Sequence, residues 1–319
     1  MELDRREILG ILMVTAAASI GVPVTGGAED AADRWERAAE THGERYNITP
    51  PVDQLRAVVG DYAGVCQRLT LRVPSDDRKR LVVNAALLAG LAGKSLNDCG
   101  AWRMGLGWLR YAADLAHELG DQSMRAWLKA EEALVHVNWA HPGPAIAAAR
   151  EAQGIGGPGR YGTAKAAGNE ARALARIGDA EGARRALDRA HDLLGRVNET
   201  PRSAYNIGER TLALYSSNVF SGIGDVGGAF DAYDRVVALY RPGAGFVLGY
   251  AAIDRASCLV RAGDLTAGCQ YAIAELERIG PAHRSAVVRR HVDDLIAAIP
   301  AEWRDCRDAR DLREMVARR

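Results

Sequence analysis

Eight side chains of this 319-residue chain have the types and the spacing of a binding surface carried by helices. Lys165 and Arg172 can hold a carboxylate, and the amides of Asn138 and Asn218 can pair with a peptide backbone. Tyr250 offers an aromatic face for stacking. The predicted binding residues are Glu131, Asn138, Trp139, Lys165, Arg172, Asn218, Tyr250 and Ser257. Such a mixed lining suits a peptide, a protein segment or an amphipathic small-molecule effector.

Two histidines in the polar and aromatic segment from His136 to His141 raise the question of a metal site. A helix binds one metal through two histidines when they stand four residues apart on one face. These histidines are five residues apart, and His141 stands at a helix end before Pro142. We therefore expect no metal here, and the sequence indicates no other cofactor.

The glycine-rich segment 154–160 precedes a helix, as a phosphate-binding loop does. A phosphate loop also needs a preceding strand and, in the Walker form, a Gly-Lys-Ser/Thr ending, and the sequence has neither. We interpret the segment as a flexible loop between helices that could also cover a ligand.

Patterns typical of enzymes are weak. The sequence contains no Gly-x-Ser-x-Gly elbow, and no cysteine stands in an evident Cys-His arrangement. Glu131 and Glu132 are adjacent, as are Asp293 and Asp294, so on a helix the members of each pair point about 100° apart and do not converge. We favour a protein that is not an enzyme. An active site assembled from residues distant in the sequence remains the alternative.

Pairs of antiparallel helices must position these side chains, and residues 164–197 predict such a pair. Small apolar residues recur at helical spacing, a Gly178-Asp179 break follows, and the helical pattern resumes at Ala183. Alanine at the crossing points allows two backbones to approach closely. The pair is therefore expected to pack as one unit.

The same pattern recurs along the chain at intervals of 37 to 48 residues. Its expected corners are Gly93, His141-Pro142, Gly178-Asp179, Gly224-Asp225 and Gly263-Asp264. Glycine suits the left-handed end of one helix, and the following aspartate can cap the next. The residues expected to face a concave groove are those two, five, nine and twelve positions along each first helix. In the first pair these are Arg80, Val83, Leu87 and Gly90.

This pattern resembles tetratricopeptide repeats, which stack helix pairs into a right-handed superhelix with a concave groove. The chain is further similar to the sensor half of bacterial regulators that carry a Cro/repressor-type helix-turn-helix domain. The matching segments are 4–7 (D-R-R-E), 112–121, 173–186, 254–263, 284–295 and 307–314. In those regulators the D-R-R-E segment follows the DNA-binding domain, whereas here it stands at residue 4. The resemblance therefore implies the effector-binding or partner-binding half, with no direct nucleic-acid binding.

Composition and the N-terminal segment bear on location. Lys+Arg and Asp+Glu are both 41, so net charge favours neither nucleic acid nor an anionic membrane. The five cysteines are an odd number without a C-x-x-C pair, which indicates free thiols in a reducing compartment. We expect a cytoplasmic protein in which residues 5–19 form a docked helix. Export or membrane anchoring through residues 5–20 is the alternative, because Arg5 and Arg6 precede an apolar run.

The expected fold is all-α, a tetratricopeptide-like right-handed solenoid. Its predicted regions are an N-terminal apolar helix and linker (1–27), a helical cap (28–74), helical repeats (75–280) and C-terminal capping helices (281–319). The predicted function is that of a non-enzymatic regulatory or scaffold protein that binds a peptide, a protein segment or a small signal molecule in its groove. The alternatives are an enzyme built in that groove and an exported or tethered scaffold. The sequence leaves a homodimer open.

Overall fold

The computed structural model describes residues 10, 31–205, 207–240, 245–279 and 281–317. The expected helix at 5–19 and the 1–27 region lie outside these residues, apart from Gly10. Fourteen α-helices and no strand occur in the described part. The helices are α2 (Ala31–Arg45), α3 (Pro51–Thr70), α4 (Ser75–Asp98), α5 (Trp102–Glu118), α6 (Gln122–Asn138), α7 (Pro142–Gly156), α8 (Tyr161–Arg176), α9 (Ala180–Gly195), α10 (Glu209–Ile223), α11 (Val226–Leu239), α12 (Gly245–Arg261), α13 (Leu265–Arg278), α14 (Ala286–Ala298) and α15 (Arg307–Ala317).

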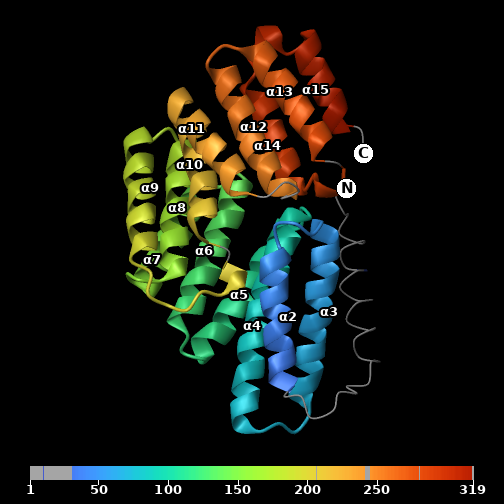
Figure 1. Cartoon of the computed structure of the whole chain (residues 1–319), viewed down its shortest axis with the longest axis vertical. Helices are drawn as coiled ribbons and strands as arrows, with labels where there is room; N and C mark the ends of the chain where they lie inside the picture. Colours follow the sequence, from blue (N-terminus) through green and yellow to red (C-terminus); the bar gives the residue numbers. More distant parts are fainter. Residues whose placement is uncertain (1–9, 11–30, 206, 241–244, 280, 318–319) are drawn as a thin grey trace.

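Consecutive helices pack as pairs from α4–α5 to α12–α13, and the pairs stack into a helical-repeat solenoid (Figure 1). The all-α fold class is therefore confirmed. Gly178, Gly224 and Gly263 have φ angles of 79°, 77° and 94°, the left-handed conformation expected at a corner. The aspartate after each of these glycines caps the next helix by accepting a hydrogen bond from a backbone N–H.

The predicted corner at Gly93 is wrong, because α4 continues through it to Asp98. The left-handed residue of this pair is Gly100, with φ 94°. Gly93 serves close packing instead: a Cβ there would lie 2.8 Å from Leu109 Cγ, and a Cβ at Gly105 would lie 2.6 Å from the Gly93 oxygen. Glycine thus marks a helix crossing here and a helix end at the later corners.

This crossing makes a prediction about two glycines of α5. Gly105→Ala is expected to lower the free energy of unfolding by about 1–3 kcal/mol, because its methyl group would press on the α4 backbone. Gly107→Ala is the matched control, since a Cβ at Gly107 meets nothing within 4 Å. It is expected to stabilise the protein by about 0.5–1 kcal/mol. Urea denaturation measures both changes, and equal effects would contradict the close crossing.

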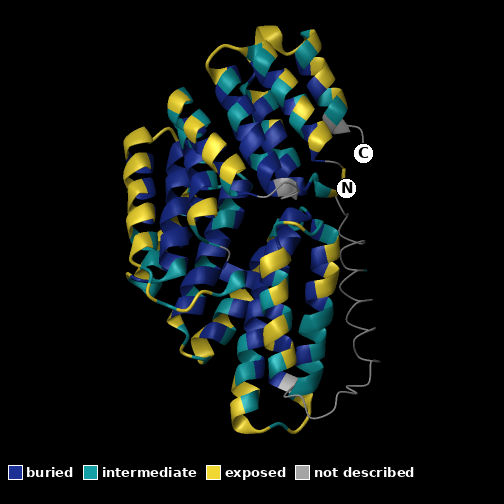
Figure 2. Cartoon of the chain, viewed as in Figure 1, coloured by how far each residue is buried: buried dark blue, intermediate teal, exposed yellow. Residues whose placement is uncertain are grey.

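The core consists largely of alanine and leucine, and it follows the first helices of the pairs. In Figure 2, α9 is exposed along its outer edge whereas α8 is buried. Small residues occupy the crossings, for example Ala167 and Ala171 in α8 and Ala183 and Ala186 in α9, all buried. The inner position of α4, α6, α8, α10 and α12 places their polar residues on the concave side.

The superhelix turns far enough to close on itself, because α14 contacts both α4 and α6. The inner face of α14 is apolar and buried, and it consists of Val288, Val292 and Leu295. At the other end, α2 and α3 pack on α4. The concave side is therefore surrounded by α4, α6, α8, α10, α12 and α14.

Within the described residues, no helix combines the length and the apolar character that a membrane span requires.

Candidate functional site

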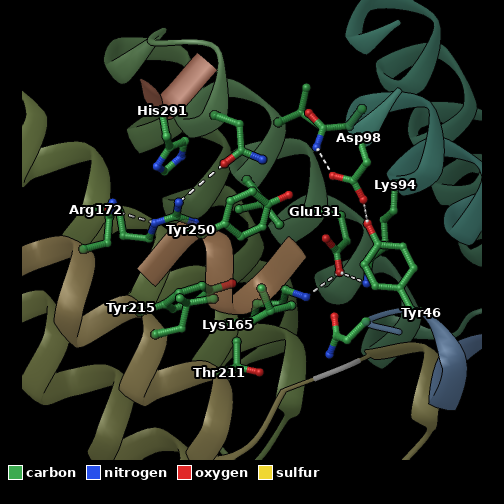
Figure 3. Close-up of a pocket in the computed structure, with 18 of the residues that line it drawn as sticks. Tyr46, Lys94, Asp98, Glu131, Lys165, Arg172, Thr211, Tyr215, Tyr250 and His291 are labelled. Atoms are coloured by element: carbon green, nitrogen blue, oxygen red, sulfur yellow. Dashed lines mark hydrogen bonds and ion pairs between the residues drawn. The ribbon is translucent and has the colours of Figure 1, made fainter. Parts of the chain in front are cut away.

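A partly open pocket, the main cavity of the structure's described part, lies on the concave side of the superhelix (Figure 3). Its volume is about 740 Å³ when the open solvent at its mouth is included. Its lining comes from α4, α6, α8, α10, α12 and α14, with Tyr46 and Asn47 added from the chain after α2. A second hollow of about 780 Å³ adjoins it. The two hollows share the lining residues Arg172, Asn218, Asp254 and His291, so they adjoin along these side chains.

Lining residues recur at an interval of seven on four neighbouring helices. The pairs are Glu131 and Asn138 on α6, Lys165 and Arg172 on α8, Thr211 and Asn218 on α10, and Val247 and Asp254 on α12. Seven residues make two helical turns, a rise of about 10.5 Å. The cavity consequently has two polar ends about two turns apart, which we call the Glu131 end and the Arg172 end.

At the Glu131 end, one carboxylate oxygen receives every hydrogen bond. Glu131 Oε1 lies 2.5 Å from Lys165 Nζ and 3.0 Å from Lys94 Nζ, and Trp127 Nε1 donates to it over 2.9 Å. Glu131, Lys165 and Lys94 are only 1%, 2% and 4% exposed. Burial raises the pKa of Glu131, but the two ammonium groups outweigh burial and hold it below its ordinary value. The carboxylate is therefore ionised at neutral pH.

The second oxygen of Glu131 has no hydrogen-bond partner in the described part of the chain. Figure 3 shows dashed lines from one oxygen only, while the other lies on the side of Tyr250. A buried carboxylate oxygen without a donor is unfavourable by several kcal/mol in an apolar site. This atom is thus an acceptor that the protein leaves unused.

Asp98 and Tyr46 extend this end of the cavity. The Tyr46 hydroxyl donates to Asp98 Oδ2, and Asn97 Nδ2 donates to Oδ1 over 3.2 Å. Burial raises the pKa of Asp98 from 3.8 to about 7, although these hydrogen bonds oppose the rise. Burial also lowers the pKa of Lys94 to about 8. The Glu131 carboxylate raises this pKa, but by less than burial lowers it. Asp98 therefore changes charge near neutral pH.

The raised pKa of Asp98 predicts how stability depends on pH. Between about pH 4 and pH 7, Asp98 keeps its proton in the folded protein and releases it in the unfolded chain. The free energy of unfolding therefore decreases as the pH rises through this range, and the stabilisation by protonated Asp98 is lost above about pH 7. Asp98→Asn keeps an acceptor for Tyr46 and cannot titrate. The difference in unfolding free energy, variant minus wild type, is expected to increase between about pH 5 and about pH 7.5. Denaturant titrations at both pH values test this, and an unchanged difference would refute it.

Arg172 dominates the other end. Its guanidinium donates from Nε to Asn218 Oδ1 over 3.0 Å and from Nη2 to Asn138 Oδ1 over 3.4 Å, and it lies 5.1 Å from the Tyr215 ring centroid. Arg172 is 7% exposed, and no carboxylate of the described residues lies within 4.0 Å of it. Burial lowers its pKa, although Tyr215 and Asp254 oppose the shift. Within the described ranges, Arg172 is therefore a buried cation without an ion pair.

Asp254 and His291 lie beside Arg172 in the shared part of the two hollows. Asn218 Nδ2 donates to Asp254 Oδ1 over 3.1 Å, and His291 Nδ1 lies 3.3 Å from the same oxygen. His291 Nε2 is buried without a partner among the described residues. The Asp254 carboxylate thus orients the imidazole and leaves its second nitrogen unused.

Six of the eight predicted binding residues line the main cavity: Glu131, Asn138, Lys165, Arg172, Asn218 and Tyr250. Ser257 lines the second hollow. Trp139 lines neither of the two, since it stacks on Trp102 at 6.0 Å and donates to Asn97 Oδ1 over 2.9 Å. The binding role of these residues stays a prediction.

Lys94 and Asn97 were not predicted as lining residues, because the first corner lies at Gly100 and not at Gly93. Moving it from Gly93 to Gly100 moves the four expected groove positions by seven residues, to Leu87, Gly90, Lys94 and Asn97. The last two line the cavity. Tyr46 and His291 lie outside the predicted repeats at 75–280. The groove positions counted along the first helix of each repeat therefore do not include them.

The weaker sequence patterns lie elsewhere. The rings of His136 and His141 are 5.9 Å apart between centroids, and no group of three metal-ligating side chains occurs in the described ranges. In the glycine-rich segment, α7 continues to Gly156, which leaves only Gly157 to Arg160 as a loop. Glu199 accepts the Tyr161 N–H over 2.7 Å, so a protein carboxylate occupies the helix end that a phosphate would use.

Fold and site together define a class: an all-helical protein of stacked helix pairs with a polar cavity on its concave side. Neither the family models nor the curated proteins include a match for the chain. Its function must therefore be argued from the site.

Proposed function

We propose that the protein is a non-enzymatic, tetratricopeptide-like regulatory protein whose cavity binds a small ligand with an anionic group. The observation that carries this proposal is Arg172, a cavity-lining guanidinium that has two amide partners and no carboxylate partner among the residues the structure describes. Burying a charge is unfavourable unless it is paired, and a planar guanidinium suits a carboxylate or a phosphate. An anionic ligand would supply the missing partner.

Ligand binding would bear on the shape of the whole superhelix. A ligand in the cavity touches helices from five or more pairs, including α14, whose contacts with α4 and α6 close the ring. Since each pair packs mainly on its neighbours, small rotations add up along the stack. The ligand would favour the form in which α14 contacts α4 and α6, and a protein partner would bind that form at the outer surface. The resemblance to sensor halves of helix-turn-helix regulators supports this role, with no direct contact to nucleic acid.

Native mass spectrometry of the protein purified from its own host tests the proposal. The expected spectrum contains a retained small molecule, and tandem fragmentation in negative mode identifies it as an acid. The Arg172→Met variant, purified in the same way, is expected to lack that mass. A wild-type spectrum without the added mass, or the same mass in both proteins, would refute the proposal.

A second candidate is an enzyme, favoured by the cluster of Asp98, Lys94, Glu131 and Tyr46. Shifted pKa values in a closed pocket are typical of active sites. Against this, the cluster groups pair with one another, and such ion-pair networks shift pKa values without catalysis. Incubating the identified ligand with the protein separates the two functions, because an enzyme converts it and a sensor returns it unchanged.

A further inference from the structure

The cavity contains two unused hydrogen-bonding groups of opposite kind, one at each end. In the part of the chain that the structure describes, Arg172 has N–H donors and no anionic partner, while Glu131 Oε2 has lone pairs and no donor. Both side chains line the same space and are more than nine-tenths buried. One molecule that reaches both ends would satisfy both groups. This argument rests on the proposed function, because it assumes that the cavity binds a ligand.

The group that meets Glu131 is a neutral donor. Two lysine ammonium groups already lie within 3.0 Å of Glu131 Oε1. A third cation would be repelled by both lysines at short range in a poorly screened site. A hydroxyl or an amide N–H fills the free lone pairs without adding charge.

The space between the two ends suits a flat or apolar body. Leu134 and Val135 on α6 and Leu214 on α10 line it. In Figure 3, Tyr250 lies between Arg172 and Glu131. Aromatic rings at such a position pack against a flat ligand by stacking or by edge-to-face contact.

We infer that the ligand is a small organic acid with a hydroxyl or amide donor at its far end and a flat or apolar body between. Its acid group lies on Arg172, and its donor lies on Glu131 Oε2. The seven-residue offset between the two ends, about 10.5 Å along the helices, requires the two groups to stand at opposite ends of the molecule.

Calorimetric titration of the wild-type protein tests this with defined probes. The acids are 4-hydroxybenzoate, 4-hydroxyphenylacetate and 3-(4-hydroxyphenyl)propionate, whose two polar groups stand progressively farther apart. Each hydroxy acid is compared with two analogues. The first is the same acid without the hydroxyl group, and the second carries a neutral hydroxymethyl group in place of the carboxylate. At least one hydroxy acid is expected to bind, and to bind about tenfold or more tightly than both of its analogues.

The outcomes distinguish this inference from the proposed function. Equal binding of a hydroxy acid and its deoxy analogue overturns the contact with Glu131 and leaves the anion site standing. Equal binding of the alcohol overturns the contact with Arg172. If none of the three hydroxy acids binds, the inferred ligand class is wrong, while an acid retained in native mass spectrometry would still support the proposed function.

A variant adds an independent readout. Glu131→Gln places an amide NH₂ where the free oxygen stood, so it is expected to remove the preference for the hydroxy acid while the deoxy acid still binds. Circular dichroism first establishes that the variant is folded. If it is not, the wild-type probe series decides the question by itself. A folded variant that keeps the full preference would overturn the assignment.

Discussion

Replacing Glu131 with alanine is expected to lower the free energy of unfolding by about 3–5 kcal/mol. The carboxylate lies against Lys94 and Lys165, and both ammonium groups are almost completely buried. Without it, two like charges remain in a low-dielectric site, near carbonyl oxygens and aromatic faces. Asp98 compensates only in part, because burial raises its pKa to about 7. Denaturant titration of the purified variant measures the loss.

The matched control is Glu181→Ala on the outer helix α9. Glu181 also pairs with a cation, Arg185, but both side chains are exposed, and such a pair contributes little. Its removal is expected to change stability several-fold less than Glu131→Ala. The triple variant Glu131→Ala, Lys94→Met, Lys165→Met should recover much of the loss, because no buried charge remains unpaired. Similar values for the two single variants would contradict the role of the cluster.

Arg172→Met is expected to weaken binding of the retained acid by about thirtyfold or more, which corresponds to about 2–5 kcal/mol. The same change removes a buried cation that has no carboxylate partner among the described residues of the ligand-free protein. The variant without ligand should therefore unfold at the same denaturant concentration as wild type, or at a higher one. Binding and stability are predicted to move in opposite directions, as is common for binding residues. Calorimetry with the acid identified by mass spectrometry and urea denaturation measure the two quantities.

Arg189→Met is the control for Arg172. Arg189 lies on α9, away from the cavity, and its guanidinium already pairs with Glu170 over 2.7 Å. This variant should keep the affinity for the acid and should gain no stability. A purely structural role for Arg172 would instead make Arg172→Met the less stable protein, with affinity little changed.

The repeat architecture could be predicted because it depends on local signals. Helical spacing of alanine and the Gly-Asp corners at 178, 224 and 263 are read from neighbouring residues, and the structure confirms these three corners. The failure at Gly93 has a physical cause, since glycine permits both a left-handed turn and a close helix crossing. Only the packing of α5 on α4 distinguishes the two.

The cavity was predictable in part for the same reason. Lys165, Arg172 and Asn218 follow from the periodicity of their own helices, and all three line it. Closure of the ring depends on how far the superhelix turns, which no local pattern encodes. The local pattern of residues 281–319 therefore predicts only capping helices, although His291 of α14 lines the cavity. The predicted region boundaries at 28–74, 75–280 and 281–319 stay predictions.

A crystal structure of the protein as purified from its own host tests the central claim most directly. The account predicts density for one small molecule in the cavity, with anionic oxygens within hydrogen-bond distance of the Arg172 guanidinium and a donor within reach of Glu131 Oε2. A cavity that holds only ordered water would contradict this prediction. An ion pair between a protein carboxylate and the Arg172 guanidinium would also contradict it.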